Sequence, residues 1–226
     1  MSIENNYKAI IWDWNGTLLN DVAYSVECIN TLLLKRNMPQ ISISKYKEKF
    51  TFPVKLYYER IGFDFNVENW EKVAMEFMSV YWFGMHTIPV FKDAIAVLNH
   101  FKNQNIKQFI VSAMEHNKLN GMVEERGLVS YFELILGIGD HYANSKQYLA
   151  KQILDEGYVP TDVLWIGDTY HDYEVANALG IDTILLTCGH QNEKVLSKAG
   201  VNLCPDLSHL IKTKEPKLKL NFGSEQ

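Results

Sequence analysis

The stretch AIIWDWNGTLL at residues 9–19 decides the fold of this chain. Four apolar residues end abruptly at Asp13, and a glycine and a small hydroxyl residue, Gly16 and Thr17, follow shortly after. This order predicts a strand buried in a parallel sheet, with a tight turn behind its last residue. Because open α/β sheets place their chemistry at the carboxyl ends of their strands, Asp13 is the first candidate functional residue.

Short apolar runs alternate with helical patterns from about residue 88 onward. Each run is bounded by polar residues or glycine, which is typical of a strand. The runs predict strands at 108–112, 133–136, 163–167 and 183–186, and the segments around them predict helices at 93–102, 116–126, 146–156 and 173–179. The alternation predicts an α/β fold with a doubly wound, Rossmann-like parallel sheet that is covered by helices on both faces.

The segment after the first strand breaks this alternation. Apolar residues recur there at helical spacing in three groups, around Cys28, Tyr57 and Val73. We therefore expect three or more helices, inserted as a helical cap of residues 19–87 into an α/β core of residues 1–18 and 88–226. The large aromatic residues of this segment are expected to form the core of the cap: Tyr57, Tyr58, Trp70, Phe77, Tyr81, Trp82 and Phe83.

The composition narrows the class of protein. The 226 residues are 47% apolar, which suffices for a sizeable core, and 27 acidic against 22 basic residues give a net charge of −5. This balance does not predict a nucleic-acid partner. No apolar run approaches the ~20 residues of a membrane span, and we expect neither a signal peptide nor a membrane partner. Three scattered cysteines, Cys28, Cys188 and Cys204, are typical of a reducing cytoplasm and predict no zinc site.

Reactive or charged side chains follow the other predicted strands as well. Ser112 closes the second strand, Lys146 opens a helix after the third, and Asp168 and Asp172 follow the fourth. Because the carboxyl ends of parallel strands meet at one edge of the sheet, we expect these residues to lie near Asp13.

The residue types suggest a particular chemistry. Three neighbouring carboxylates do not all stay ionised without a cation. Oxygen ligands suit Mg²⁺, which is commonly shared between carboxylates and a substrate phosphate. A bound Mg²⁺ would screen a phosphate so that an anionic nucleophile can approach it, and aspartates do accept phosphoryl groups in covalent catalysis. A lysine and a hydroxyl at neighbouring strand ends would then hold the phosphoryl oxygens.

Together these motifs resemble the haloacid dehalogenase superfamily, on its phosphatase side and with a phosphoglycolate-phosphatase-like layout. The resemblance covers essentially the whole chain, since the four motifs occur in order and the cap follows the first strand. It implies a phosphatase of small soluble phosphomonoesters with Asp13 as the nucleophile. It further implies Mg²⁺ held by Asp13, the backbone carbonyl of Asn15 and Asp168, with Asp172 a ligand directly or through water. It also implies a phosphate held by Thr17, Ser112 and Lys146.

Asn15 departs from this pattern. Phosphatases of the superfamily carry an aspartate at this position, which protonates the leaving oxygen and then activates water, and an amide does neither. Asn15 would still serve as a metal ligand, because the implied ligand is its backbone carbonyl oxygen. His171 and His190, which follow strand ends in the sequence, are candidates to replace the missing acid. Without a replacement, the chain is expected to hydrolyse aryl or acyl phosphates more readily than alkyl phosphates.

Two questions of function stay open at this point. Lys55, in a turn of the cap, either contacts the far end of the substrate or is an exposed lysine. The chain as a whole is either a phosphatase slowed by Asn15 or a catalytically weak phosphate-binding or regulatory protein. Other reactions of the superfamily fit less well: dehalogenation would leave Asp168 and Asp172 idle, phosphonate cleavage needs an imine-forming cap lysine, and a phosphomutase usually needs the acid that Asn15 lacks.

Overall fold

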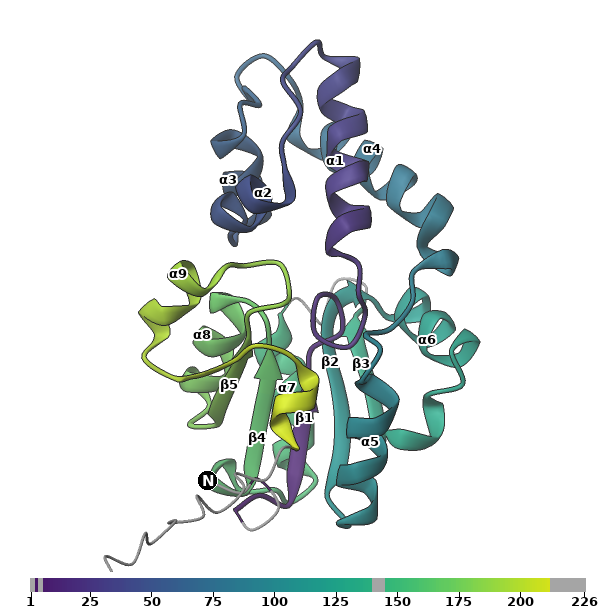
Figure 1. The fold of residues 1–226 in the computed structure, drawn as a ribbon, viewed down its shortest axis with the longest axis vertical. Helices are drawn as coiled ribbons and strands as arrows, with labels where there is room; N and C mark the ends of the chain where they lie inside the picture. Colours follow the sequence, from purple (N-terminus) through teal and green to yellow (C-terminus); the bar gives the residue numbers. More distant parts are fainter. Residues whose placement is uncertain (1–2, 4–5, 140–144, 212–226) are drawn as a thin grey trace, which may run out of the picture.

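A computed structural model describes residues 3, 6–139 and 145–211 of the chain. Its centre is a parallel sheet of six strands in the order β3-β2-β1-β4-β5-β6 (Figure 1). The strands are β1 Ala9–Trp12, β2 Lys107–Glu115, β3 Leu134–Ile138, β4 Val163–Gly167, β5 Asp182–Leu186 and β6 Asn202–Cys204. The predicted doubly wound parallel sheet is therefore confirmed.

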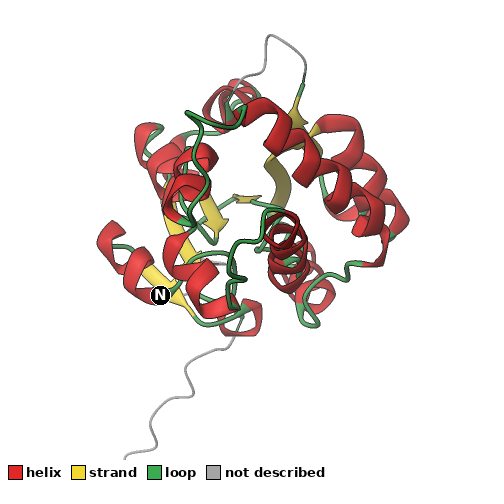
Figure 2. Ribbon diagram, turned by 90° about the horizontal axis from the view of Figure 1, so that it is seen from above, coloured by secondary structure: helices red, strands yellow, loops and turns green. Residues whose placement is uncertain are grey.

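Helices lie on both faces of the sheet and above its carboxyl edge (Figures 1 and 2). The helices of the core are α5 Ala94–Asn103, α6 His116–Glu125, α7 Lys146–Asp155, α8 Tyr170–Ala178 and α9 Glu193–Leu196. The helices between β1 and α5 are α1 Val22–Lys35, α2 Ile43–Lys49, α3 Val54–Arg60 and α4 Trp70–Gly84. Short 3₁₀ turns occupy Met85–Thr87, Val129–Tyr131, Pro160–Asp162, Ser197–Ala199 and Leu207–Leu210.

The residues of β1 alternate between the two faces of the sheet. Ile10 and Trp12 pack in a cluster with residues of α5 and α6, whereas Ala9 and Ile11 pack with residues of α7 and α8. All four side chains are fully buried. A central strand covered on both faces has no solvent side, which explains why its sequence is one continuous apolar run.

The four helices α1–α4 form a separate layer above the carboxyl edge of the sheet (Figure 1). They share a core in which Leu33, Tyr58 and Val73 are buried. The chain enters and leaves this layer at one place, where Leu19 and Val90 form an isolated antiparallel bridge. The sequence expectation of three or more helices between the first strand and the rest of the sheet is confirmed.

The boundaries of some elements differ from the prediction. Strand β2 continues three residues beyond Ser112, and its register with β3 shifts between Val111 and Glu115. Helix α8 begins at Tyr170 rather than at residue 173, because Thr169 and Asp172 form a capping box at its start. Helix α9 and strand β6 have four and three residues, too few for a periodic pattern to reveal.

The prediction that Trp82 and Phe83 belong to the core of the cap is wrong. Trp82 is 37% exposed and Phe83 is 91% exposed, although the neighbouring Tyr81 is buried. Helical geometry explains the difference, because each residue turns the side chain by about 100° around the axis. The inward face of α4 carries Val73, Phe77 and Tyr81 at intervals of four, and the next two residues therefore point away from it.

A tight loop follows β1 and carries Asp13. The backbone N–H of Asp13 donates to Ile166 O at 2.9 Å, and Leu19 N donates to Trp14 O at 2.9 Å. Gly16, at φ +71°, closes the loop against the carboxyl end of β4, and a Cβ built on it would overlap Asp168 Oδ2 and His190 Cδ2. Only glycine therefore satisfies both the backbone conformation and the close packing at this position.

We predict that Gly16→Ala destabilises the protein more than a change of backbone conformation alone would. Gly200→Ala is the matched control, because Gly200 has a similar φ of +67° but open space where the Cβ would lie. We expect Gly200→Ala to lower the free energy of unfolding by about 1–2 kcal/mol, and Gly16→Ala to lower it by at least a further ~1 kcal/mol through the overlap. Urea unfolding of both variants measures this, and equal losses would contradict the close packing.

Candidate active site

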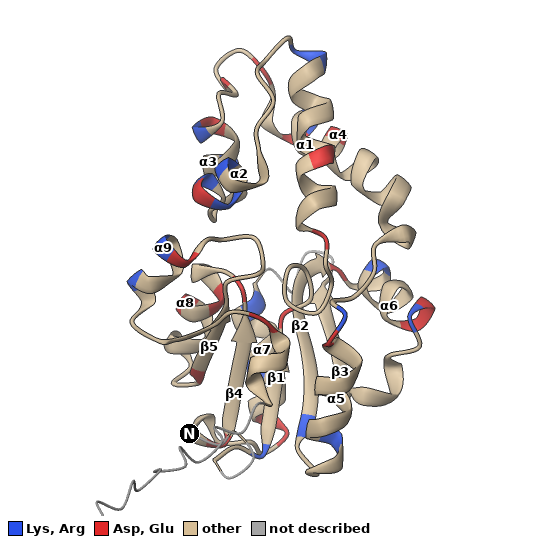
Figure 3. Ribbon diagram, viewed as in Figure 1, with Lys and Arg blue, Asp and Glu red and all other residues tan. Residues whose placement is uncertain are grey.

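Three buried carboxylates meet at the carboxyl edge of the sheet. Asp13 follows β1, Asp168 follows β4, and Asp172 lies in the first turn of α8. Each offers an oxygen, and these oxygens lie within 4.8 Å of one another. Parallel strands bring the group together, because β1 and β4 are neighbours in register and end at the same edge. Acidic and basic positions meet here, between the strands and the cap (Figure 3).

Lys146 is the cation that faces this cluster. It is the first residue of α7 and is only 4% exposed. Its Nζ donates to Asp13 Oδ1 at 2.6 Å and to Asp172 Oδ1 at 2.7 Å. The helix begins here because the side chain of Ser145 accepts a hydrogen bond from Tyr148 N. A buried lysine in this position fixes the two carboxylates relative to each other.

The three carboxylates differ in proton affinity. Burial raises the pKa of Asp13 well above its usual range, and the charges of Asp172 and Asp168 add to this effect against the opposing charge of Lys146. Burial likewise raises the pKa of Asp168, to about 6. Burial acts in the same direction on Asp172, but Lys146 and hydrogen bonds from Thr169 outweigh it and lower the pKa. The cluster therefore favours a bound proton or cation beside Asp13.

The donor set fits a small hard cation. Asp13, Asp168 and Asp172 offer only oxygen atoms, and among the described residues the positively charged Lys146 contacts two of these carboxylates and not the third. A second positive charge would relieve the repulsion that raises the pKa of Asp13. Mg²⁺ prefers carboxylate and carbonyl oxygens, so the residues present are suited to it.

The two predicted hydroxyl residues lie at the cluster but make different contacts. Thr17 Oγ1 donates to Asp168 Oδ1 at 3.1 Å, which orients that carboxylate. Ser112 lines the cavity beside Asp13, and its Oγ accepts a hydrogen bond from Met114 N at 3.1 Å. Ser112 thus stands where a ligand above Asp13 would meet it, whereas the hydroxyl of Thr17 is directed at a carboxylate.

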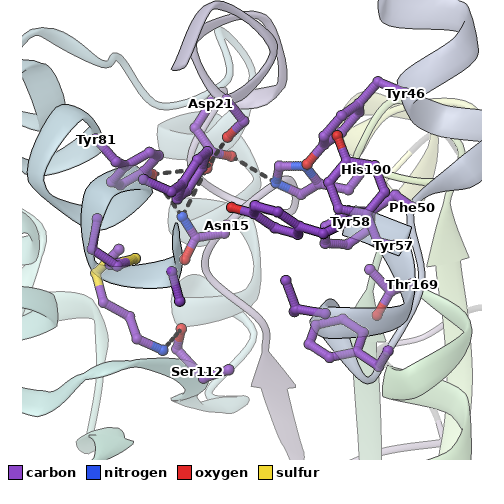
Figure 4. Close-up of a pocket in the computed structure, with 18 of the residues that line it drawn as sticks. Asn15, Asp21, Tyr46, Phe50, Tyr57, Tyr58, Tyr81, Ser112, Thr169 and His190 are labelled. Atoms are coloured by element: carbon purple, nitrogen blue, oxygen red, sulfur yellow. Dashed lines mark hydrogen bonds and ion pairs between the residues drawn. The ribbon is translucent and has the colours of Figure 1, made fainter. Parts of the chain in front are cut away.

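Asn15 uses both hydrogens of its amide within the protein. Its Nδ2 donates to Asp21 Oδ2 at 2.8 Å and to Tyr81 Oη at 2.9 Å. Tyr81 Oη also donates to Asp21 Oδ2, at 2.8 Å (Figure 4). Gly16 N donates to Asp21 Oδ1. An amide suits this position because it gives hydrogens to a carboxylate, whereas a second ionised carboxylate would repel Asp21.

Sequence reasoning missed Asp21. The residue precedes α1 and looks in sequence like an ordinary helix cap, yet its side chain makes no capping hydrogen bond. It is 1% exposed and pairs with His190, whose Nε2 lies 3.1 Å from Asp21 Oδ1. Burial raises the pKa of Asp21, but His190, Asn15 and Tyr81 outweigh it and lower the pKa. In the sequence, nothing distinguishes Asp21 from an ordinary N-cap residue of a helix.

His190 joins helix α2 to the loop after β5. Burial alone would lower its pKa, but the charge and hydrogen bond of Asp21 raise it to about 9, which favours the protonated ring. Its Nδ1 lies 2.8 Å from Tyr46 Oη of α2. Beside this contact, Lys47 Nζ donates to Thr187 O and Gln191 Nε2 donates to Phe50 O. These bonds hold α2 against the loop after β5.

The other candidate histidine lies farther out. His171 stacks against Phe52 with ring centroids 4.7 Å apart, and its Nδ1 is 3.4 Å from Glu174 Oε2. It does not line the cavity above Asp13. Of the two histidines that the sequence offered as a replacement acid, only His190 lies in contact with the groups around Asn15.

A cavity of about 280 Å³ lies between the carboxylate cluster and the cap. Its floor carries Asp13, Asn15, Ser112, Lys146, Thr169 and His190, and its upper part is lined by residues of α2 to α4 (Figure 4). Lys55 is not part of this lining. Its exposed side chain lies on the outside of α3 with Nζ 5.5 Å from the ring centroid of Phe65, so the structure does not bring it to the site.

Known proteins share both the sequence pattern and the fold. A family model described as haloacid dehalogenase-like hydrolase matches residues 10–186. Phosphoglycolate phosphatase of Synechococcus elongatus is 21% identical over 201 residues, which are 88% of this chain and 91% of that protein. Phosphoglycolate phosphatase 1 of Pseudomonas aeruginosa is 22% identical over 208 residues, covering 88% of this chain and 76% of that protein.

Solved structures agree with the fold. A hydrolase of the haloacid dehalogenase-like family from Streptococcus pneumoniae superposes with a TM-score of 0.73 at 19% identity, covering 87% of this chain and 92% of its own. A haloacid dehalogenase-like protein of unknown function from Agrobacterium tumefaciens superposes with a TM-score of 0.76 at 18% identity. The match covers 90% of this chain and 96% of that protein. With a family match over residues 10–186, the chain belongs to the haloacid dehalogenase-like hydrolases, and within them it resembles the phosphoglycolate phosphatases.

Proposed function

We propose that the protein is a Mg²⁺-dependent phosphatase that hydrolyses small soluble phosphomonoesters through a phosphoryl group carried on Asp13. The observation that supports this most strongly is the convergence of Asp13, Asp168, Asp172 and Lys146 on the floor of one cavity under the cap. The similarity to phosphoglycolate phosphatases points in the same direction.

The reaction proceeds in two displacements at phosphorus. A carboxylate oxygen of Asp13 forms a bond to phosphorus, and the ester oxygen of the substrate leaves with the electron pair of the broken P–O bond. Ser112 and Lys146 hold the phosphoryl oxygens, and Thr17 keeps Asp168 in place. Water then attacks phosphorus, and its displacement of the Asp13 carboxylate releases inorganic phosphate.

The metal site of this proposal consists of the carboxylates of Asp13, Asp168 and Asp172 with the backbone carbonyl of Asn15. A bound Mg²⁺ supplies positive charge that lets an anionic carboxylate approach an anionic phosphate. The closed cap covers the cavity through the contacts of α2 with the loop after β5, which keeps bulk water from the phosphorylated Asp13.

Asn15 limits the rate of this chemistry for some substrates. An amide neither donates a proton to the leaving oxygen nor removes one from water, and its two hydrogens are already bound to Asp21 and Tyr81. This same observation favours a second candidate function, a phosphate-binding or regulatory protein with little turnover. Measured turnover separates the two, because only the phosphatase releases phosphate repeatedly.

The domain division follows from the same proposal. Residues 1–18 and 88–226 form the catalytic core, and residues 19–87 form the cap that covers the substrate. Within the described part of the chain, no helix is both long and apolar enough to cross a membrane. A cytoplasmic location and a phosphorylated small molecule as the partner remain predictions.

We predict that Asp13→Asn abolishes phosphate release while the fold is retained, because a neutral amide does not attack phosphorus. Asp162→Asn is the matched control, since the side chain of Asp162 forms a surface pair with Lys8, whose side chain is 76% exposed, and lies outside the lining of the cavity. Phosphate release with p-nitrophenyl phosphate measures the activity, and beryllofluoride trapping should label Asp13. Activity in Asp13→Asn equal to that of the control would reject Asp13 as the nucleophile.

We predict that Mg²⁺ stabilises the folded protein, because it binds the folded carboxylate cluster and not the unfolded chain. At a hundredfold excess over its dissociation constant it adds about 2.7 kcal/mol, which raises the Tm by roughly 5–11 °C for a chain of this length. Thermal unfolding with Mg²⁺, and with Na⁺ at equal ionic strength, measures the shift. Asp168→Asn should lose most of it and Asp162→Asn should keep it; a shift that persists in Asp168→Asn would place the cation elsewhere.

We predict that a carboxylate is accepted at position 15 when its neighbour is exchanged as well. Asn15→Asp alone places two carboxyl groups in contact and should lower stability at neutral pH. The double variant Asn15→Asp/Asp21→Asn reverses donor and acceptor and keeps the hydrogen bond between positions 15 and 21. It also removes the carboxylate partner of His190, so urea unfolding must first show that the variant is folded. We expect it to raise kcat/KM for alkyl phosphates by ~10²–10⁴, the usual contribution of general acid–base catalysis. No gain in a folded double variant would mean that another group already supplies the proton.

A further inference from the structure

The cavity above Asp13 has two chemically different ends. Its floor is polar, whereas its upper wall is built from aromatic rings of the cap: Tyr46, Phe50, Tyr57, Tyr58, Trp70 and Phe77. Figure 4 shows Tyr57 and Tyr58 beside Phe50 and Tyr46, above Thr169 and Ser112. A phosphate held at the floor therefore directs the rest of its molecule toward a wall of rings.

The rings support one another as a preformed surface. Tyr58 meets Trp70 edge-on, with ring centroids 5.2 Å apart and an interplanar angle of 83°. Phe50 lies 5.4 Å from Tyr57, and Tyr46 stacks with Phe50 at 5.2 Å. Aromatic walls with fixed geometry favour flat apolar groups, which stack or meet them edge-on.

The size of the cavity suits such a group. Its volume of about 280 Å³ exceeds the ~150 Å³ that holds one benzene molecule in an engineered protein cavity. The remaining space accommodates a phosphoryl group at the floor. The volume is therefore sufficient for a single substituted ring attached to phosphate.

The charges of the lining argue against a second anion on the substrate. The basic side chains of the described lining are Lys146 and His190. Lys146 pairs with Asp13 and Asp172, and His190 pairs with Asp21. Lys55, the remaining candidate for a substrate contact, is outside the lining. A carboxylate such as that of glycolate would face aromatic rings, and the basic side chains among the described lining residues are already paired with carboxylates of the protein, so its desolvation would be poorly offset.

Asn15 selects the same class of substrate by independent chemistry. Asn15 supplies no proton, and both ring nitrogens of His190 are engaged, Nε2 with Asp21 Oδ1 and Nδ1 with Tyr46 Oη. The leaving oxygen therefore departs as an anion. A phenol such as the tyrosine side chain ionises with a pKa of about 10, whereas water, which resembles an alcohol in this respect, has a pKa of about 15.7. A phenolic oxygen is therefore much easier to expel than an alkoxide.

Because the shape of the cavity and the chemistry of Asn15 agree, we propose that the substrate is an aryl phosphate, the phosphate monoester of a phenolic ring that carries no second anionic group. This inference rests on the proposed phosphatase function. It names the substrate class of the same site and distinguishes it from the small anionic substrate that the names of the relatives suggest.

Four substrates separate the contributions of shape, charge and leaving group. Phenyl phosphate has both the aromatic ring and a good leaving group. Cyclohexyl phosphate has a ring of similar size, but its leaving group is an alkoxide. 2-Phosphoglycolate carries a second anionic group, a carboxylate. Acetyl phosphate needs neither a proton donor nor the aromatic wall. With Mg²⁺, we expect kcat/KM for phenyl phosphate to exceed the values for cyclohexyl phosphate and 2-phosphoglycolate by at least ~100-fold.

Neighbouring residues of α4 supply a matched pair of variants. Ala74 lines the cavity, whereas Met75 is 73% exposed on the outside of the helix. Ala74→Trp fills the space for the ring and should lower the ratio of phenyl to acetyl phosphate kcat/KM at least tenfold. Met75→Trp should leave this ratio unchanged. Ala74→Met, a smaller change, should give an intermediate ratio and covers the case in which Ala74→Trp does not fold.

The outcomes separate the two levels of the proposal. Absence of turnover with all four phosphates overturns the phosphatase function and the aryl inference with it. Turnover in which 2-phosphoglycolate matches phenyl phosphate keeps the phosphatase and overturns the aryl substrate. Equal rates for phenyl and cyclohexyl phosphate also overturn it, because a proton donor is then present. If the ratio of phenyl to acetyl phosphate kcat/KM stays constant in the Ala74 variants, the ring does not bind against the cap, and the aryl proposal is overturned.

Discussion

The structure depends on the crowding of three buried carboxylates beside one buried ammonium group. Asp13, Asp168 and Asp172 would repel one another at this spacing if nothing else held them. Lys146 offsets part of the charge, Thr17 orients Asp168, and the start of α8 binds Asp172 through Thr169. The fold thus maintains an excess of negative charge at one point, and that excess is what makes the point suitable for a cation and for phosphoryl transfer.

A second set of charges lies directly above the first and ties the cap to it. Asp21 contacts three parts of the protein. It accepts hydrogen bonds from Asn15 and Gly16 in the loop after β1 and from Tyr81 of α4, and it pairs with His190 in the loop after β5. His190 in turn contacts Tyr46 of α2. A movement of α2 or α4 away from the core would therefore disturb hydrogen bonds that lead to Asn15, two positions after Asp13, and these bonds couple the position of both helices to the floor of the cavity.

The identity of residue 15 and the lining of the cap are consistent with each other. An amide suits the contact with Asp21 but supplies no proton, which in the mechanism that we propose would restrict the reaction to substrates with good leaving groups. The aromatic wall formed around Tyr58, Trp70 and Phe77 favours flat apolar substituents over charged ones. Both features thus favour the same substrates, although they lie on different elements and act by different physical effects.

The sequence by itself determined the elements whose signal is local. The apolar run of β1 and the alternation of strands and helices predicted the parallel sheet, and parallel strands necessarily bring Asp13, Ser112 and Asp168 to one edge. Only the tertiary structure decided which side chains enter the cavity. Asp21 and His190 are 169 residues apart, and no local pattern relates them. Likewise, the rotation of α3 and α4, which turns Lys55 and Phe83 outward, is set by packing between helices rather than by residue type.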